Sequence, residues 1–301
     1  MTTQIQTEEV LTASNRRQNL FSGFKFPKTF LGLLPILSFA GIFLVWPLSA
    51  IFRASLHDNH NHITFAVYRE LFTGIYREAF ITSFKLAFLS ALIAGFCGAA
   101  VSAALVRTSG TFRSLISSAS GVLANTGGVP LAFMFIAAYG QDGLITKFLL
   151  WLHWDIYAGS FDIFNFWGIL FVYGFFQIPL MVIIFTPAME NMKKEWAEAN
   201  DSLGGSHFQY LRYVAIPTLI PAFLSATLLL FASSFSAYAT ARAMTIGNLP
   251  LVPLVIGTLV DGNVIPSEAN LGDALAMGMV AVSVVVIAAY LALLRFSKRR
   301  S

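Results

Sequence analysis

The chain has 301 residues, of which 56% are hydrophobic and 11% are charged. A soluble domain would carry about 25% charged residues, so this composition excludes an ordinary soluble protein and indicates a membrane protein with several spans. The net charge of +4 is explained by membrane topology, as shown below, and we expect no nucleic-acid partner. The single cysteine, Cys97, excludes an internal disulfide.

Residues 1–28 are polar and carry Arg16, Arg17, Lys25 and Lys28 directly before the first apolar run. A cleavable signal peptide would place its apolar region much earlier. We therefore predict a cytosolic N-terminal tail that leads into an uncleaved first span.

Six apolar stretches reach the roughly 20 residues that a membrane-spanning helix needs. We place them at residues 30–51, 80–106, 115–139, 166–189, 218–240 and 274–294. The predicted fold is all-α. The first span and an external loop occupy residues 29–79, a core of five spans occupies 80–296, and 297–301 form a second cytosolic tail.

The lysines and arginines predict the orientation of these spans. Thirteen of the 19 fall on the side that holds both termini and the segment between the fourth and fifth spans, which leaves six for the other side. Because positive residues favour the cytoplasmic side, we expect both termini and that segment in the cytosol. The expected location in a bacterial inner membrane is what the family resemblance described below implies.

The sequence lacks the residues that several classes of function require. No Asp or Glu falls inside any span, although an ion-coupled secondary transporter normally needs one; that class is kept as the alternative function. An intramembrane enzyme would need paired Ser/His or Asp groups at span depth, and the sequence offers none, so we predict no catalytic residue and no cofactor. The histidines His57, His60 and His62 could bind a metal, but nothing in their spacing fixes ligand geometry, and a solvated loop is favoured.

The segment between the fourth and fifth spans, residues 190–217, predicts two short helices joined by a tight turn. Met192, Trp196, Ala199 and Leu203 recur at spacings of four, three and four, which places them on one stripe of a helix. Gly204 can adopt the left-handed conformation that ends this helix. Ser206 and Gln209 have the spacing of a capping box that would start the next helix. A helix lying on the lipid surface is the alternative interpretation.

The same segment resembles the EAA loop of binding-protein-dependent ABC importer permeases. The family pattern is Glu-Ala-Ala, three residues, Gly, nine residues, Ile, one residue and Leu-Pro. The matching residues are Glu198, Ala199, Gly204 and Pro217. Asn200 takes the place of the second Ala, Val214 occupies the preceding apolar position and Ile216 takes the place of the Leu. The resemblance extends from about residue 80 to residue 296.

The resemblance implies a mechanical role. In this family the EAA helix sits in a cleft of a cytosolic ATPase subunit, and it transmits closure of the ATPase dimer to the spans. It implies three partners beside membrane lipid: the ATPase dimer, a second permease subunit and an external substrate-binding protein. The implied coupling residues are Met192, Trp196, Glu198, Ala199, Leu203, Gly204 and Pro217.

Three further runs resemble the permeases that import polyamines, aminoethylphosphonate or ferric ion. They begin at Asn125, Ser236 and Asn270. We expect these runs near the substrate pathway, where five residues offer uncharged polar groups: Asn125, Tyr173, Gln177, Ser236 and Tyr238.

Overall fold

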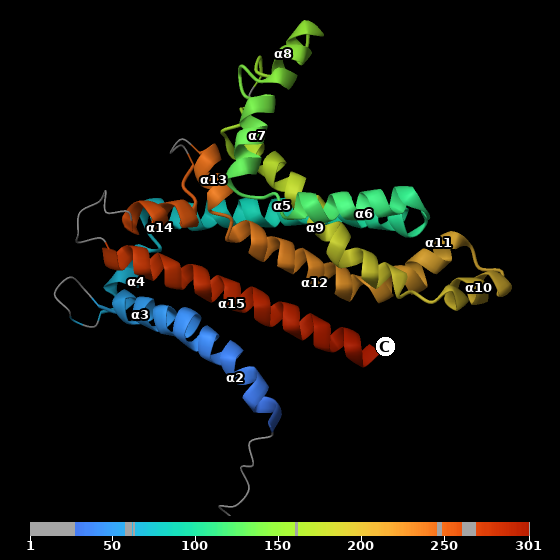
Figure 1. Cartoon of the computed structure of the whole chain (residues 1–301), viewed down its shortest axis with the longest axis horizontal. Helices are drawn as coiled ribbons and strands as arrows, with labels where there is room; N and C mark the ends of the chain where they lie inside the picture. Colours follow the sequence, from blue (N-terminus) through green and yellow to red (C-terminus); the bar gives the residue numbers. More distant parts are fainter. Residues whose placement is uncertain are drawn as a thin grey trace, which may run out of the picture. The chain divides into compact units, whose positions relative to one another are not determined.

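The computed structural model describes residues 28–57, 62, 64–159, 162–245, 249–260 and 269–300, and its elements are all helices (Figure 1). The chain forms two compact units, one ending at Arg53 and one beginning at Ala54. The predicted N-terminal tail lies almost wholly outside the described residues.

The first unit is a nearly continuous apolar helix. It comprises α2 (Lys28–Ala40), the π-helical turn η1 (Gly41–Val45) and most of α3 (Trp46–Ser55). Its large side chains, including Phe43 and Trp46, are exposed. Residues Leu33–Ser55 are long and apolar enough to cross a membrane.

The second unit is built on four long helices. These are α5 (Gly74–Val106), α9 (Phe166–Glu190), α12 (Ile216–Phe235) and α15 (Ala269–Arg300). Helix α5 packs on α9 and α12, and α12 packs on α15. A Cβ atom at Gly98 would lie 2.5 Å from the Cβ of Met181, so α5 and α9 approach as closely as they do because position 98 has no side chain.

Two short helices complete the packing against α15. They are α4 (Ala66–Glu70) and α14 (Val252–Val260). The backbone N–H of Val252 donates to Ser83 Oγ on α5 at 2.8 Å, which fixes the start of α14. Residues 54–57 and 64–79 belong to the second unit, and the predicted core boundary at residue 80 stays a prediction.

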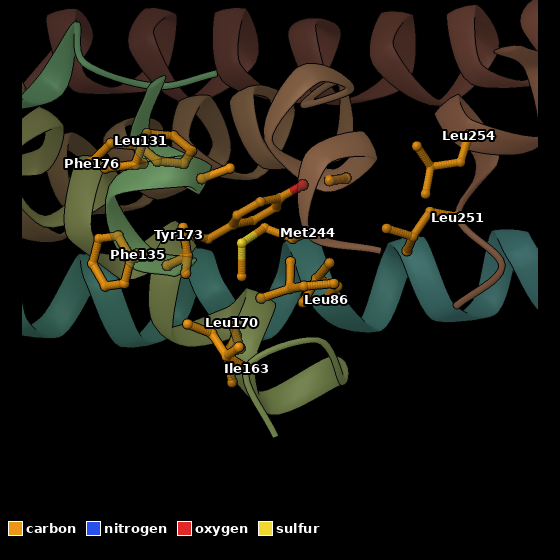
Figure 2. Packing of buried hydrophobic residues seen from close by; sticks show 14 residues of the cluster. Leu86, Leu131, Phe135, Ile163, Leu170, Tyr173, Phe176, Met244, Leu251 and Leu254 are labelled. Atoms are coloured by element: carbon orange, nitrogen blue, oxygen red, sulfur yellow. The ribbon is translucent and has the colours of Figure 1, made fainter. Parts of the chain in front are cut away.

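The largest buried cluster joins α5 and α9 to α7 (Val129–Tyr139) and α13 (Ala239–Met244). Figure 2 shows Tyr173 of α9 at its centre, between Leu131 and Met244. Helices α7 and α13 each follow a short non-helical segment, at residues 125–128 and 236–238, and this cluster packs both helices on α9.

The third apolar stretch is not the continuous helix that we predicted over residues 115–139. Helix α6 (Thr111–Ala124) ends at the cap Asn125, and α7 begins only at Val129. Gly128 has a φ of 94°, which a residue with a side chain rarely adopts, and a proline follows in the first turn of α7. The 14 residues of α6 extend only about 21 Å. The stretch long and apolar enough to span runs from Val129 to Trp151 and includes α8 (Leu144–Trp151).

The fifth span is also displaced from the predicted residues 218–240. It begins at His207 and ends at Phe235, because α11 (His207–Tyr210), the π-helical turn η2 (Leu211–Ala215) and α12 follow one another without interruption. With six candidate spans in the described residues, the predicted all-helical fold with six spans is confirmed, while the bounds of the third and fifth spans are corrected.

Candidate functional site

The segment between α9 and α12 forms a bent helical pair, which we call the elbow (residues 194–210). Helix α10 (Lys194–Ser202) is its first arm and α11 its second. Figure 1 shows both at one end of the second unit. The first arm begins later than we predicted: α9 extends through Glu190, and Met192 lies before α10, outside the helical stripe.

The turn of the elbow is a Schellman motif. Gly204 has a φ of 74°. Its N–H donates to the carbonyl of Asp201 at 3.0 Å, and the N–H of Gly205 donates to the carbonyl of Asn200 at 2.8 Å. These two bonds satisfy carbonyls that the end of α10 would otherwise leave unpaired. The left-handed glycine expected at position 204 is therefore what closes the helix.

Asn200 is a residue whose role sequence reasoning missed. Its Nδ2 donates to the carbonyl of Gly205 at 3.0 Å. A Cβ atom at Gly205 would lie within 2.8 Å of the Asn200 side chain, so the amide packs directly on that glycine. The residue that departs from the family pattern thus ties the first arm to the turn between the two arms. The pattern itself could not show this, because the bond runs to backbone.

The second arm starts as the spacing of Ser206 and Gln209 indicates. The N–H of Gln209 donates to Ser206 Oγ at 3.3 Å, and the N–H of Ser206 donates to Gln209 Oε1 at 2.7 Å. Pro217 lies inside the continuous helix, two residues after the π-helical turn η2, and has no N–H to donate to the preceding turn. The arm nevertheless continues directly into the fifth span.

The face of α10 that carries the predicted coupling residues is open. Leu203 is 88% exposed and Trp196 is 37% exposed, and Glu198 and Ala199 are also exposed. Leu203 stands at the C-cap of α10. An exposed tryptophan and an exposed leucine on one short helix, flanked by charged residues, form a surface suited to a protein partner.

An ion pair fixes the base of the elbow. Arg113, in the first turn of α6, donates to Glu190 at the end of α9. Both side chains are about 40% exposed, at 40% and 39%. The sequence placed Arg113 and Glu190 on the same side of the membrane but could not pair them, since 77 positions separate them.

The helix breaks at residues 125–128 and 236–238 meet. The backbone N–H of Gly128 donates to Thr240 Oγ1 at 2.8 Å, which joins the start of α7 to α13. The first break directly precedes the span that begins at Val129, and the second directly follows the span that ends at Phe235. We call this meeting point the break junction.

The predicted pathway residues lie around the break junction in two different settings. Tyr173 and Gln177 of α9 are buried, and Tyr173 Oη donates to the carbonyl of Ala237 at 3.1 Å. Asn125 and Ser236, the caps that follow α6 and α12, are exposed. Tyr238 is partly exposed and packs on Gly257 of α14.

A buried polar network crosses three helices beside the junction. Gln177 Nε2 donates to Ser234 Oγ at 2.5 Å, and Ser234 Oγ lies 2.7 Å from Ser90 Oγ. Gln177 Oε1 is buried without a hydrogen-bond partner. Ser90 and Ser234 were missed by sequence reasoning, because a serine inside a span is common and only the fold brings these two together.

The described residues hold no group of three or more His, Cys, Asp or Glu that could bind a metal ion. His60, part of the histidine-rich loop considered above, lies outside the described residues.

Comparison with solved structures defines the class of fold. A bacterial ABC transporter that imports the acidic polysaccharide alginate matches with a TM-score of 0.66 and 15% identity, over 96% of this chain and 98% of that chain. The alginate transporter in complex with an alginate pentasaccharide-bound periplasmic protein matches with a TM-score of 0.67 and 15% identity, over 90% and 94% of the two chains. The fold is that of an ABC importer permease.

The family model for the inner membrane component of binding-protein-dependent transport systems matches residues 95–301, and the chain belongs to this family. It is therefore a multi-pass inner-membrane component without a catalytic role of its own. This membership excludes the ion-coupled secondary transporter that the sequence had left as an alternative.

The curated relatives include the following two permeases. A probable sulfate transport system permease protein cysT from Helicosporidium sp. subsp. Simulium jonesii is 30% identical over 122 residues, which are 40% of this chain and 43% of the relative. The spermidine/putrescine transport system permease protein PotC of Escherichia coli K12 is 29% identical over 125 residues, which are 42% of this chain and 46% of the relative. The chain thus spans less than half the length of either relative.

Proposed function

We propose that this chain is one half of the membrane channel of an ABC importer, and that its elbow is the contact with a separate ATPase dimer. A second permease subunit forms the other half, and an external binding protein delivers the solute. Both termini and the elbow face the cytosol, as the distribution of positive residues predicts.

One observation carries this proposal: α10 stands on a fixed turn with its predicted docking face open. Leu203 and Trp196 are exposed, while the Schellman motif and Asn200 hold the arm in place. A helix designed to lie on lipid needs a continuous apolar face. Helix α10 has only one large apolar residue, Trp196, among four charged residues, so a protein cleft accounts for it better.

The substrate pathway is proposed to run along the break junction. Asn125, Ser236 and Tyr238 offer exposed uncharged polar groups there, and Tyr173 and Gln177 stand behind them in the core. We propose a small solute, with a polyamine, aminoethylphosphonate or ferric ion as the candidates. Similarity to the spermidine/putrescine permease supports the first of these.

The test is retention of the ATPase subunit during purification of the full complex. Trp196→Ala should weaken that retention, because truncating a central interface tryptophan costs on the order of 2 kcal/mol of binding, or roughly 30-fold in affinity. Trp151→Ala is the matched control, since Trp151 is 73% exposed but lies on α8, away from the elbow. Equal retention in both variants would refute the docking role.

A further inference from the structure

A pocket with a volume of about 420 Å³ lies where α7 ends, α8 turns back and α9 begins. Its wall includes Tyr139, Phe171, Trp154 and Asp155, with Leu149 and Ile156 beside them. The volume is within the range of roughly 300–1,000 Å³ that small-molecule sites occupy. The pocket lies near the start of α9, whereas the elbow follows the end of α9. A helix of 25 residues is about 37 Å long, so the length of α9 separates the pocket from the elbow.

The aromatic wall is held rigidly by its neighbours. The rings of Tyr139 and Phe171 meet edge to face, with centroids 5.5 Å apart. Phe135 contacts both rings, at centroid distances of 5.6 Å each. Such packing fixes ring orientation before any ligand arrives, so the wall is a preformed surface.

The loop that brings Trp154 to the pocket is also fixed. His153 has a φ of 61°, the one positive value among the described residues other than glycine. The N–H of Trp154 donates to the carbonyl of Leu149 at 2.9 Å. A strained residue persists where the surrounding structure holds it in place, and here it presents the indole, which is 67% exposed, to the pocket.

Asp155 supplies a carboxylate with a defined direction. Its Oδ1 accepts from the N–H of Tyr157 at 2.9 Å. Tyr157 Oη donates to the carbonyl of Tyr139 at 2.5 Å, which ties the loop to the end of α7. Burial raises the pKa of Tyr157, and the charge of Asp162 raises it further, so the phenol keeps the proton that this bond requires.

The segment around the pocket is acidic in a chain that is basic as a whole. Residues 140–165 carry three aspartates and one lysine. That lysine, Lys147, pairs with Asp142 at 3.4 Å, which leaves the charges of Asp155 and Asp162 uncompensated within the segment.

We propose that this pocket binds the ammonium group of an amine, with Trp154, Tyr139 and Phe171 against the cation and Asp155 as its counter-ion. Aromatic faces attract ammonium groups through the ring quadrupole, and quaternary ammonium ligands are recognised by cages of this composition. The amine comes either from a free solute or from the headgroup of a membrane lipid. The pocket is separate from the elbow and the break junction, so it is a site beyond the proposed function and stands whichever solute the importer carries.

The exposed tryptophans also fit an ordinary membrane-interface belt, in which Trp residues sit at headgroup level. A belt would give Trp151 and Trp154 the same role. Only Trp154 lines the pocket, so the two residues separate the explanations.

The test measures binding of radiolabelled choline to the full chain in nanodiscs of phosphatidylglycerol. Its competitor is 3,3-dimethylbutan-1-ol, which has the shape of choline without the charge. We expect choline to bind and the neutral alcohol to compete at least about 5-fold more weakly, since a cation–π contact at a partly exposed site is worth about 1 kcal/mol. Trp154→Leu and Asp155→Asn should each weaken choline binding by about 3-fold or more, while Trp151→Leu and Asp142→Asn should leave it unchanged.

A second series of nanodiscs contains phosphatidylethanolamine. Loss of choline binding in that series would identify the lipid headgroup as the natural amine, and unchanged binding would identify a solute; either result supports an ammonium site. Absence of choline binding in phosphatidylglycerol, or equal competition by the neutral alcohol, would overturn the proposal without reliance on any variant. Equal effects of Trp151→Leu and Trp154→Leu would overturn it as well.

Discussion

Gly204→Ala is the sharpest perturbation of the elbow. A Cβ atom at this position would meet nothing within 4 Å, so the cost comes from the backbone alone. Holding a residue with a side chain at a φ of 74° costs about 1–2 kcal/mol. Replacement of glycine also lowers the conformational entropy of the unfolded chain, which stabilises the folded state by about 0.4–1 kcal/mol. The net destabilisation of the closed turn is therefore about 1 kcal/mol.

Hydrogen exchange at the Gly205 amide measures this cost directly. That N–H donates to the carbonyl of Asn200 only while the Schellman motif is closed. A loss of about 1 kcal/mol corresponds to roughly 5-fold faster exchange. Gly204→Asn should be closer to the parent protein, because asparagine visits the left-handed region more readily than alanine.

Gly127→Ala is the control, since a Cβ atom there would also meet nothing within 4 Å and no positive φ is involved. Exchange at the Gly205 amide should be the same in this variant as in the parent. If Gly204→Ala also exchanged like the parent, the left-handed conformation would not be what closes the elbow. In that case Gly204→Ala should also transport normally. Our reasoning predicts instead that Gly204→Ala weakens the coupling between ATP hydrolysis and uptake.

Three more predictions concern separate parts of the second unit. Ser234→Ala removes the central member of the buried polar network, which should destabilise the folded protein by about 1–2 kcal/mol. The variant should therefore have a lower melting temperature in detergent. Arg113→Glu or Glu190→Arg alone should raise ATP hydrolysis that is uncoupled from uptake, and the double swap should restore coupling. The effect on stability should be small, since an exposed ion pair contributes only roughly 0–1 kcal/mol. A cysteine at Ser206 should react with an impermeant thiol reagent only from the cytosolic side, and one at Asp142 only from outside.

Each of these has its own control or contradiction. Ser233→Ala changes a neighbouring serine outside the network and should not shift the melting temperature. Failure of the double swap to restore coupling would show that the Arg113 and Glu190 side chains act independently. The labelling needs a Cys97→Ala background, because that native thiol is exposed. Labelling of position 206 from outside would reverse the proposed topology.

The features that the sequence predicted well are those set by local physical rules. Six apolar runs of sufficient length had to become helices that satisfy their own backbone groups. The turn at Gly204 and the cap at Ser206 follow from interactions within a few residues, and both formed as predicted. The stripe of α10 was predicted less well, since Met192 belongs to the linker and not to the helix.

The features that the sequence did not predict depend on contacts between distant segments. A run of apolar residues from 115 to 139 reads as one helix, because hydropathy does not register the positive φ of Gly128. Thr240, which holds that break, is 112 positions away. The partners of Arg113 and of Ser90 are likewise 77 and 144 positions away, and no periodicity in the chain could have paired them.

We propose that movement of the elbow reaches the proposed substrate pathway through these distant contacts. From His207 to Phe235 the chain is one helical rod of 29 residues, or about 43 Å, without a break where it joins the elbow. Its far end is Ser236, where the break junction begins, and Thr240 just beyond is bonded to Gly128. Arg113 and Glu190 tie α9 to α6, whereas α11 is part of the rod. We therefore expect a displacement of α10 to shift the rod against α9. The polar groups that such a shift would rearrange first are Ser234 and Gln177, which bridge these two helices.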